Sequence, residues 1–313
     1  MFGEAEILVP AELAGLHEKY SGEEGRRWIV GLPIMAASYL DQWQVVIDGP
    51  VSSGAVALII PVVRRDGSKA VLKLQPVDDE TGGEPDALKA WAGRGAVRLL
   101  EHDRVSGAML LERLDASQDL NTMEDDLAAA QIIAELLVQL NSVPAPQGMR
   151  RLRDVGAATL AGTPDAVRLA ADPDERRLLI SCADRFQELI MDRLDDRLLH
   201  WDLHYYNTLS TLTEPRQWKA IDPKPLAGDP GFELLPALWN RWEDLVAAGD
   251  LPRALLRRFD LMTDVLGLDR SRAAGWTLGR VLQAAVWDLV RFDEGHIEPE
   301  HRTIAEVLIK ARA

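Results

Sequence analysis

The 313-residue chain is long enough to bury a sizeable core, and its 47% hydrophobic and 27% charged residues are typical of a globular protein. The net charge of −15 argues against nucleic acid as a partner and is compatible with a cationic substrate. One cysteine, Cys182, excludes a disulfide-based fold, and it is expected to be a buried structural thiol. The N-terminus carries Glu4, Glu6 and Glu12 and no long apolar run is present, so we expect a cytoplasmic protein with no membrane segment.

The N-terminal residues 10 to 45 are predicted as helix or irregular structure, with a break at Gly31-Leu32-Pro33. Their apolar side chains are expected to pack into the core: Trp28, Ile29, Leu32 and Trp43. No chemistry is assigned to this part of the chain.

The first strands are predicted at 45–47, 56–63 and 70–74, where apolar β-branched runs are separated by turn sequences. This pattern indicates an antiparallel meander. The small residues Ser52, Ser53 and Gly54 between the first two strands would let backbone N–H groups approach phosphates. They match neither glycine-rich phosphate motif, so by themselves they indicate only a turn.

Lys73 is the first candidate for chemistry. Alternation along residues 70–74 places Leu72 and Leu74 on one face of the strand and Lys73 on the other. A lysine in an apolar strand needs an anion, which nucleotide phosphates or Glu84 could supply. Glu84 begins a helix predicted to end at Trp91, where an acid also stabilises the helix dipole. The alternative for Lys73 is an edge-strand lysine that blocks aggregation.

A second strand pair is predicted at 97–100 and 108–111, after which residues 112–115 leave the sheet. This segment would be a hinge whose backbone groups, at Glu112 and Leu114, bind adenine. We therefore predict a nucleotide-binding domain at 1–115 and a second domain at 116–313.

The second domain is predicted to be mainly helical because the apolar period changes from Thr122 onward. Its first helix carries an apolar stripe that includes Ile133 and Leu137. Further helices are predicted at 176–193, 232–248, 251–266, 275–293 and 300–312. Tryptophans on these later helices are expected in the core: Trp239, Trp242, Trp276 and Trp287.

The stretch from His200 to Asn207 has the H-x-D-L-x-x-x-N spacing of a kinase catalytic loop. Asp202 would orient a substrate hydroxyl and accept its proton, and Asn207 would offer an amide oxygen to Mg²⁺. Asp222, which follows the short apolar run 218–221, would be the second metal ligand. The alternative is that these polar residues form only Asx-turns and caps.

Together with these residues, five short stretches resemble the aminoglycoside phosphotransferases, in particular the branch of streptomycin and hydroxyurea kinases. They are Ala70-Val71-Leu72-Lys73-Leu74, Val97-Arg98-Leu99-Leu100, Leu111-Glu112-Arg113-Leu114, Leu199-His200-Trp201-Asp202-Leu203-His204 and Ala220-Ile221-Asp222-Pro223-Lys224-Pro225. Two further stretches, beginning at Gly228 and at Ala273, extend the resemblance to the C-terminal part.

The resemblance implies an α+β, protein-kinase-like bilobal fold: an N-terminal lobe with an antiparallel sheet and one key helix, and a mainly helical C-terminal lobe. It also implies ATP, Mg²⁺ and transfer of a phosphoryl group to a hydroxyl of a small cationic sugar derivative. On this basis Asp202 is the catalytic base, Asn207 and Asp222 are metal ligands, and Lys73 with Glu84 is the phosphate clamp. Only ten residues separate Asp222 from Glu233, which leaves no room for a peptide-positioning segment.

The acceptor is expected to be an aminoglycoside, with streptomycin as first choice, bound by carboxylates. The candidates are Asp229, Glu233, Asp288 and Asp293. Asp288 is preferred because helical spacing lets it face a cleft beside Trp287, although a solvated acid or an ion pair with Arg291 would explain it too. Two other functions remain open: a metabolic amino-sugar kinase, for example for glucosamine, and a catalytically dead nucleotide-binding protein.

Overall fold

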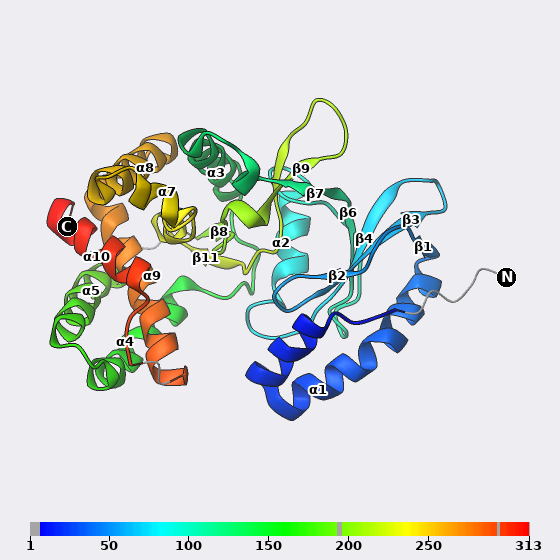
Figure 1. The fold of residues 1–313 in the computed structure, drawn as a ribbon, viewed down its shortest axis with the longest axis horizontal. Coiled ribbons are helices and arrows are strands. Elements are labelled where there is room, and N and C mark those ends of the chain that lie inside the picture. Colours follow the sequence, from blue (N-terminus) through cyan, green and yellow to red (C-terminus); the bar gives the residue numbers. More distant parts are fainter. Residues whose placement is uncertain (1–6, 193–195, 293–294, 313) are drawn as a thin grey trace. The chain divides into compact units, whose positions relative to one another are not determined.

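A computed structural model of the protein describes residues 7–192, 196–292 and 295–312 (Figure 1). The chain divides into two compact units. The first contains Met1–Asp115 and Thr211–Gln217, and the second contains Ala116–Ser210 and Trp218–Ala313. The short segment Thr211–Gln217, predicted as part of the second domain, therefore groups with the first unit.

The first unit is built on an antiparallel sheet whose strands are β1 (Val45–Ile47), β2 (Ser52–Ser53), β3 (Leu58–Arg64), β4 (Lys69–Leu74), β5 (Leu99–His102) and β6 (Met109–Glu112). Their order is β1-β3-β4-β6-β5, with β2 paired to β3. The predicted antiparallel meander is therefore present. Since β4 lies between β3 and β6, the interpretation of Lys73 as an edge-strand lysine is wrong.

One face of this sheet forms the core of the unit. Leu58, Ile60 and Val62 of β3 and Leu72 and Leu74 of β4 have no exposed surface. Each buried side chain of this size contributes about 2 kcal/mol through the hydrophobic effect. Because side chains alternate along a strand, the neighbouring positions, including Lys73, lie on the opposite face.

Helix α1 (Ala11–Gln42) precedes the sheet and has a bend, visible in Figure 1. The bend lies at Gly22, whose φ of 54° belongs to the left-handed region. The predicted break at residues 31–33 is wrong, since the helix continues through Pro33. Trp28, Ile29 and Trp43 pack against the core as expected, partly buried, and Leu32 is fully buried.

Helix α2 (Glu84–Trp91) has the predicted bounds. It begins after Gly83, carries Pro85 in its first turn, and ends at Ala92 in the left-handed conformation. Its buried face includes Ala87, Leu88 and Trp91, so packing fixes the helix axis and with it the position of Glu84.

The second unit is mainly helical, with α3 (Asp126–Asn141), α4 (Leu152–Leu169), α5 (Pro173–Met191), α6 (Leu235–Leu238), α7 (Trp242–Ala247), α8 (Leu251–Leu266), α9 (Arg270–Phe292) and α10 (Pro299–Ala311). Short 3-10 helices are η1 (Leu120–Thr122), η2 (Tyr205–Asn207) and η3 (Pro230–Glu233). Strands β7 (Leu114–Asp119), β9 (Thr208–Thr211) and β10 (Trp218–Ala220) form one small sheet, and β8 (Arg197–Leu199) pairs with β11 (Leu226–Gly228). Among the described residues, no helix combines the length and apolar composition needed to cross a membrane.

Helix α4 was not predicted, and its buried positions explain why. They are Leu152, Gly156, Thr159, Thr163 and Ala166, which follow a helical period but are mostly small or polar. A Cβ on Gly156 would lie 2.7 Å from Ile190 of α5, so the small residues allow close helix packing instead of supplying an apolar signal. The apolar stripes predicted for α3 and α5 are buried, and Cys182 is buried as expected.

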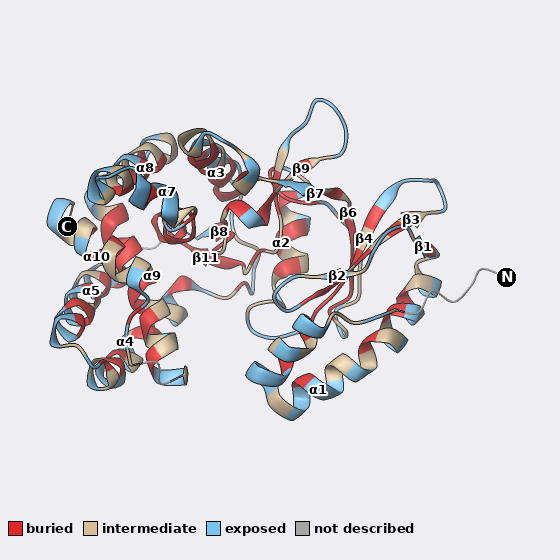
Figure 2. Cartoon of the chain, in the orientation of Figure 1, coloured by how far each residue is buried: buried red, intermediate tan, exposed pale blue. Residues whose placement is uncertain are grey.

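The single helix predicted at 232–248 is wrong, because the chain there forms η3, α6 and α7 with Arg241 in the left-handed region at φ 48°. The tryptophan prediction is only partly correct. Trp276 is fully buried, whereas 36% of Trp239 and 44% of Trp287 are exposed. Figure 2 shows that burial is concentrated on the inner faces of the helices.

Candidate active site

Lys73 and Glu84 form a buried ion pair in the first unit. The ammonium group of Lys73 lies 2.9 and 2.8 Å from the two carboxylate oxygens of Glu84. Only 4% of Lys73 and 1% of Glu84 are exposed. Gln75, which the sequence analysis missed, donates its Nε2 to the same carboxylate at 2.7 Å. Two donors thus fix the position of Glu84, and Glu84 in turn fixes Lys73.

Strand register places Ser52 on the same face of the sheet as Lys73. Ile59 of β3 is opposite Ser52 of β2 on one side and opposite Lys73 of β4 on the other. Directly paired residues in antiparallel strands point to the same face. The predicted turn is more ordered than expected, since Ser52 and Ser53 form a strand and Gly54 donates its N–H to the carbonyl of Ala57 at 2.9 Å. A Cβ on Gly54 would meet no atom within 4 Å, so no other protein atom covers that side of the residue.

The hinge candidates lie where β6 ends and β7 begins. Glu112 accepts the backbone N–H of Arg98 with its carboxylate at 2.8 Å, and its own N–H donates to the carbonyl of Arg98 at 2.9 Å. Leu114 is buried. These contacts tie Glu112 to Arg98, and the adenine contact itself stays a prediction.

In the second unit, strand β8 leads directly into the loop from His200 to Asn207. The carboxylate of Glu233 accepts the backbone N–H groups of His200 at 2.8 Å and Trp201 at 2.7 Å. It also accepts from Asn141 of α3 at 2.9 Å. Burial raises the pKa of Glu233, although these three donors act in the opposite direction. Glu233 has no exposed surface, so the geometry does not support the predicted substrate contact and indicates a structural role in holding the loop.

The ring of His200 fixes the next turn of the loop. Its Nε2 lies 3.0 Å from the carbonyl of Ile221, and its Nδ1 lies 3.3 Å from the backbone N–H of Asp202. A neutral ring protonated at Nε2 satisfies both contacts, donating to Ile221 and accepting from Asp202. Burial lowers the pKa of His200 to about 4, which keeps the ring neutral at physiological pH.

The strand pair β9 and β10 brings the predicted metal ligands together. Thr208 pairs with Ala220, and the N–H of Ile221 donates to the carbonyl of Asn207 at 2.9 Å. Asn207 also donates Nδ2 to the backbone carbonyl of Asp202 at 3.0 Å, which directs its amide oxygen away from that carbonyl. Asp222 follows one residue after Ile221, in the left-handed region at φ 57°.

One amide and one carboxylate oxygen are suitable ligands for Mg²⁺, which commonly takes its remaining ligands from phosphates and water. Among the described residues, no group of three or more histidine, cysteine, aspartate or glutamate side chains could hold a metal by itself. The residues present therefore fit a metal that arrives with a nucleotide, and they do not form a closed structural site.

Asp202, the predicted base, is half-buried, and its carboxylate lies 3.2 Å from the ammonium group of Lys224. The backbone N–H of Lys224 donates to the carbonyl of His200 at 3.0 Å, which keeps this lysine beside the loop. Lys224 belongs to the stretch Ala220 to Pro225, and no role was predicted for it. The local signal was its position two residues after Asp222.

Tyr205 anchors the far end of the loop. Its N–H donates to the side chain of Asn240 at 2.6 Å, and its hydroxyl donates to Asp126 at 3.1 Å. Asp126 also pairs with the buried Arg258 at 2.7 Å. Burial raises the pKa of Tyr205, so its hydroxyl stays protonated. No sequence signal identified these partners, because they come from distant helices.

The remaining substrate candidates differ in their surroundings. Asp229 is buried, accepts the N–H of Gly231 at 2.9 Å and pairs with Arg272 at 3.0 Å, so both its oxygens have structural partners. Asp288 is half-buried on α9, and the guanidinium of Arg291 stacks on Trp287 at 4.3 Å. Asp293 lies outside the described residues.

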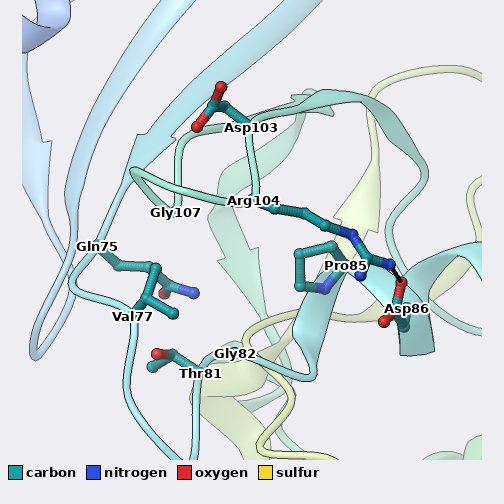
Figure 3. Close-up of a pocket in the computed structure, with 9 residues that line it drawn as sticks. All are labelled: Gln75, Val77, Thr81, Gly82, Pro85, Asp86, Asp103, Arg104 and Gly107. Carbon is teal, nitrogen blue, oxygen red and sulfur yellow. Dashed lines mark hydrogen bonds and ion pairs between the residues drawn. The ribbon is translucent and has the colours of Figure 1, made fainter. Parts of the chain in front are cut away.

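The first unit also contains a pocket of about 160 Å³, lined in part by the first turn of α2 (Figure 3). It is lined by Gln75, Val77, Thr81, Gly82, Pro85, Asp86, Asp103, Arg104 and Gly107. Arg104 and Asp86 form an ion pair at 2.7 Å. Neither Lys73 nor the Ser52–Gly54 hairpin lines it, so this pocket does not correspond to the predicted phosphate-binding face.

Comparison with known proteins places this geometry in context. Residues 42–291 match the family described as aminoglycoside/hydroxyurea antibiotic resistance kinase. The chain is 51% identical to a streptomycin 6-kinase of Streptomyces glaucescens over 96% of this chain and 97% of that protein. It is 49% identical to a hydroxyurea phosphotransferase of Kitasatospora aureofaciens over 97% of this chain and 87% of that protein.

Among solved structures, the fold is similar to a thermostable mutant of an aminoglycoside phosphotransferase in a ternary complex with ADP and hygromycin B. The TM-score is 0.60 at 18% identity, over 87% of this chain and 97% of the other. This similarity confirms the predicted kinase-like α+β fold.

Proposed function

Because the chain belongs to the family of aminoglycoside/hydroxyurea antibiotic resistance kinases, we propose that it transfers the γ-phosphoryl group of ATP to a hydroxyl of streptomycin, its 6-hydroxyl, and so confers resistance. The observation that carries the proposal is 51% identity to a streptomycin 6-kinase along nearly the whole of both chains. A cytoplasmic location, where ATP is abundant, follows from the proposed reaction.

In this proposal the first unit binds the nucleotide. Lys73, held by Glu84, contacts the phosphates, and backbone N–H groups of the Ser52–Gly54 hairpin approach them from a neighbouring strand. Backbone groups of Glu112 and Leu114 bind the adenine. Asn207 and Asp222 hold Mg²⁺, which when bound neutralises the developing phosphate charge.

Asp202 orients the acceptor. Its carboxylate accepts a hydrogen bond from the substrate hydroxyl while the hydroxyl oxygen attacks the γ-phosphorus, and the bond from that phosphorus to the leaving ADP oxygen breaks. An aspartate with an ordinary pKa of about 3.9 is a weak base for an alcohol, so it takes the proton late in the transfer. Lys224 is close enough to Asp202 to stabilise charge on the transferred phosphoryl group.

Hydroxyurea is the second candidate acceptor, because identity to a hydroxyurea phosphotransferase is 49%, almost as high as to the streptomycin kinase. The earlier alternatives, an amino-sugar kinase and a catalytically dead protein, have no comparable relative in their favour.

The test is ADP release by the purified protein with Mg²⁺, ATP and one acceptor at a time: streptomycin, hydroxyurea or glucosamine. We expect streptomycin to give the highest kcat/KM, and NMR of the product to show phosphate on the 6-hydroxyl. A preference for hydroxyurea, or ATP hydrolysis that no acceptor stimulates, would refute the proposal.

A further inference from the structure

The second unit contains a cavity of about 640 Å³, next to the proposed catalytic loop. We call it the Trp239 cavity. Its lining residues come from η1, from the loop, from the α6–α7 region and from the start of α10, and they include Tyr206, Trp239, Glu243, Glu298, Glu300 and His301. Its volume falls in the range of small-molecule sites, and it far exceeds what hydroxyurea would occupy.

Aromatic rings with unusual exposure line this cavity. Tyr206 is 57% exposed and Trp239 is 36% exposed. Tyr206 directly precedes Asn207 in the loop, and the ring of His204 contacts both Tyr206 and Trp239 at centroid distances of 6.2 and 6.1 Å. Water solvates an exposed aromatic ring poorly, so covering the ring with a ligand is favourable. The face of the ring also attracts cations, guanidinium groups above all.

Three of the four carboxylates that line the cavity have no cationic partner among the described residues. Glu243, Glu298 and Glu300 have no ion-pair or hydrogen-bonding partner for their side chains within the part of the chain that the structure describes. Asp244, by contrast, pairs with Arg241, which also donates to the backbone carbonyl of Met123. The remaining titratable group, His301, has its pKa lowered to about 4 by burial and is neutral at physiological pH. The cavity therefore carries three uncompensated negative charges beside exposed aromatic rings.

We propose that the Trp239 cavity binds the guanidinium groups of streptomycin, with Trp239 and Tyr206 stacking on them and Glu243 and Glu300 accepting their hydrogen bonds. This inference rests on the proposed function and adds the residues that select the substrate. The ring of streptomycin that bears the 6-hydroxyl also bears two guanidinium groups. Tyr206, which would hold one guanidinium, belongs to the same loop as Asp202, four residues earlier.

The inference also replaces the earlier preference for Asp288, which does not line this cavity. Guanidinium binding needs planar donors to meet carboxylates and flat apolar surfaces at once, and the Trp239 cavity offers both kinds of surface. Hydroxyurea is uncharged and small, so it gains nothing from either. The cavity thus predicts selectivity for streptomycin over hydroxyurea.

The test uses the full chain and the double variant Glu243→Gln/Glu300→Gln, with Trp239→Leu as a second variant. The control is Glu188→Gln, which removes an exposed carboxylate of α5 outside the cavity. Calorimetry measures the Kd of streptomycin and of streptidine, the isolated diguanidino ring. We expect both Kd values to rise at least about tenfold in the double variant, while ATP binding stays unchanged. A tenfold rise corresponds to roughly 1.4 kcal/mol of binding free energy lost with the charge-assisted contacts.

Trp239→Leu should weaken both ligands as well, and Trp239→Phe should recover part of the loss, since a ring is restored. Unchanged binding of streptidine in a double variant that still binds ATP overturns the inference, and so does a wild-type protein that does not bind streptidine. If the wild type binds streptidine through these residues but does not phosphorylate streptomycin, only the proposed function fails.

Discussion

The carboxylate of Glu233 receives the backbone N–H groups of two consecutive loop residues, His200 and Trp201. The second of these has a φ of 67°, a conformation that costs free energy for a non-glycine residue. Hydrogen bonds to a buried carboxyl acceptor compensate for that cost. At the scale of single residues, the site therefore depends on groups that position Asp202 as much as on Asp202 itself.

Asp202→Asn is expected to lower kcat by roughly 10²- to 10⁴-fold, because the amide keeps the shape of the side chain and cannot accept the proton. ATP affinity should stay within about twofold, since in the proposed reaction Asp202 contacts the acceptor and not the nucleotide. Steady-state kinetics and equilibrium ATP binding check both parts. Wild-type turnover by this variant would exclude Asp202 as the catalytic residue.

Asn207→Ala and Asp222→Ala should each raise the Mg²⁺ concentration for half-maximal activity by roughly tenfold or more, because each would remove an oxygen ligand of the proposed metal site. The effect should be larger for Asp222, which supplies a negative charge. Magnesium titrations at saturating ATP measure this. If both titrations match that of the wild type, the metal binds elsewhere.

The lowered pKa of His200 predicts that the stability of the fold depends on pH. Its folded-state pKa of about 4 lies below its ordinary value of 6.5, so the unfolded chain binds the extra proton between these values. The contribution of the neutral ring is therefore complete above pH 6.5 and is lost as the pH falls toward 4, by about 3 kcal/mol.

Comparing the wild type with His200→Gln isolates this effect from other titrating groups, including Glu233. Glutamine can still donate toward the carbonyl of Ile221 and does not titrate. The stability difference between the two proteins, measured by urea unfolding, should shift against the wild type by about 3 kcal/mol from pH 6.5 to 4. Parallel pH curves would show that His200 becomes protonated without cost in the folded state.

At the scale of elements, β4 and α2 meet through the side chains of Lys73, Gln75 and Glu84. Gln75 follows the end of β4, and its amide N–H group fixes one oxygen of Glu84. Carboxylate oxygens only accept hydrogen bonds, so this contact also determines which end of the Gln75 amide faces Glu84. In Figure 3 the same amide group points toward the interior of the neighbouring pocket.

Gln75→Leu removes one donor to Glu84 and leaves Lys73 as its partner. We expect the KM for ATP to rise roughly three- to tenfold, because a buried hydrogen bond contributes about 1 kcal/mol. The KM for the acceptor should not change. Glu84→Gln should have a larger effect, because it leaves the ammonium group of Lys73 without a charged partner. Unchanged ATP kinetics for Gln75→Leu would show that Lys73 alone suffices to position Glu84.

At the scale of the whole molecule, the net charge of −15 attracts a cationic acceptor over distances comparable with the Debye length. Raising NaCl from 0.05 to 0.5 M should therefore increase the KM for streptomycin roughly three- to tenfold. The double variant Glu243→Gln/Glu300→Gln should show a weaker salt dependence. Equal salt dependence in both proteins would mean that the attraction comes from the overall charge and not from the Trp239 cavity.

The sequence by itself determined the features that are encoded at short range. Alternation along five residues separated Lys73 from the core face, helical spacing predicted α3 and α5, and the octet from His200 to Asn207 was recognisable from its spacing. Such patterns can be recognised in a single sequence because strand and helix periods relate residues that are close together in the chain.

Only the tertiary structure decided which distant groups complete these features. Glu233 and Asn240 bind loop residues that lie more than 30 positions away in the chain. Sequence periodicity relates only nearby residues, so it could not predict these contacts. Helix α4 was missed because close packing required small residues at its buried positions. Trp239 was wrongly placed in the core because apolar character does not reveal whether a ring faces the core or a cavity. Burial is a property of the assembled chain, so the Trp239 cavity could be recognised only from the structure.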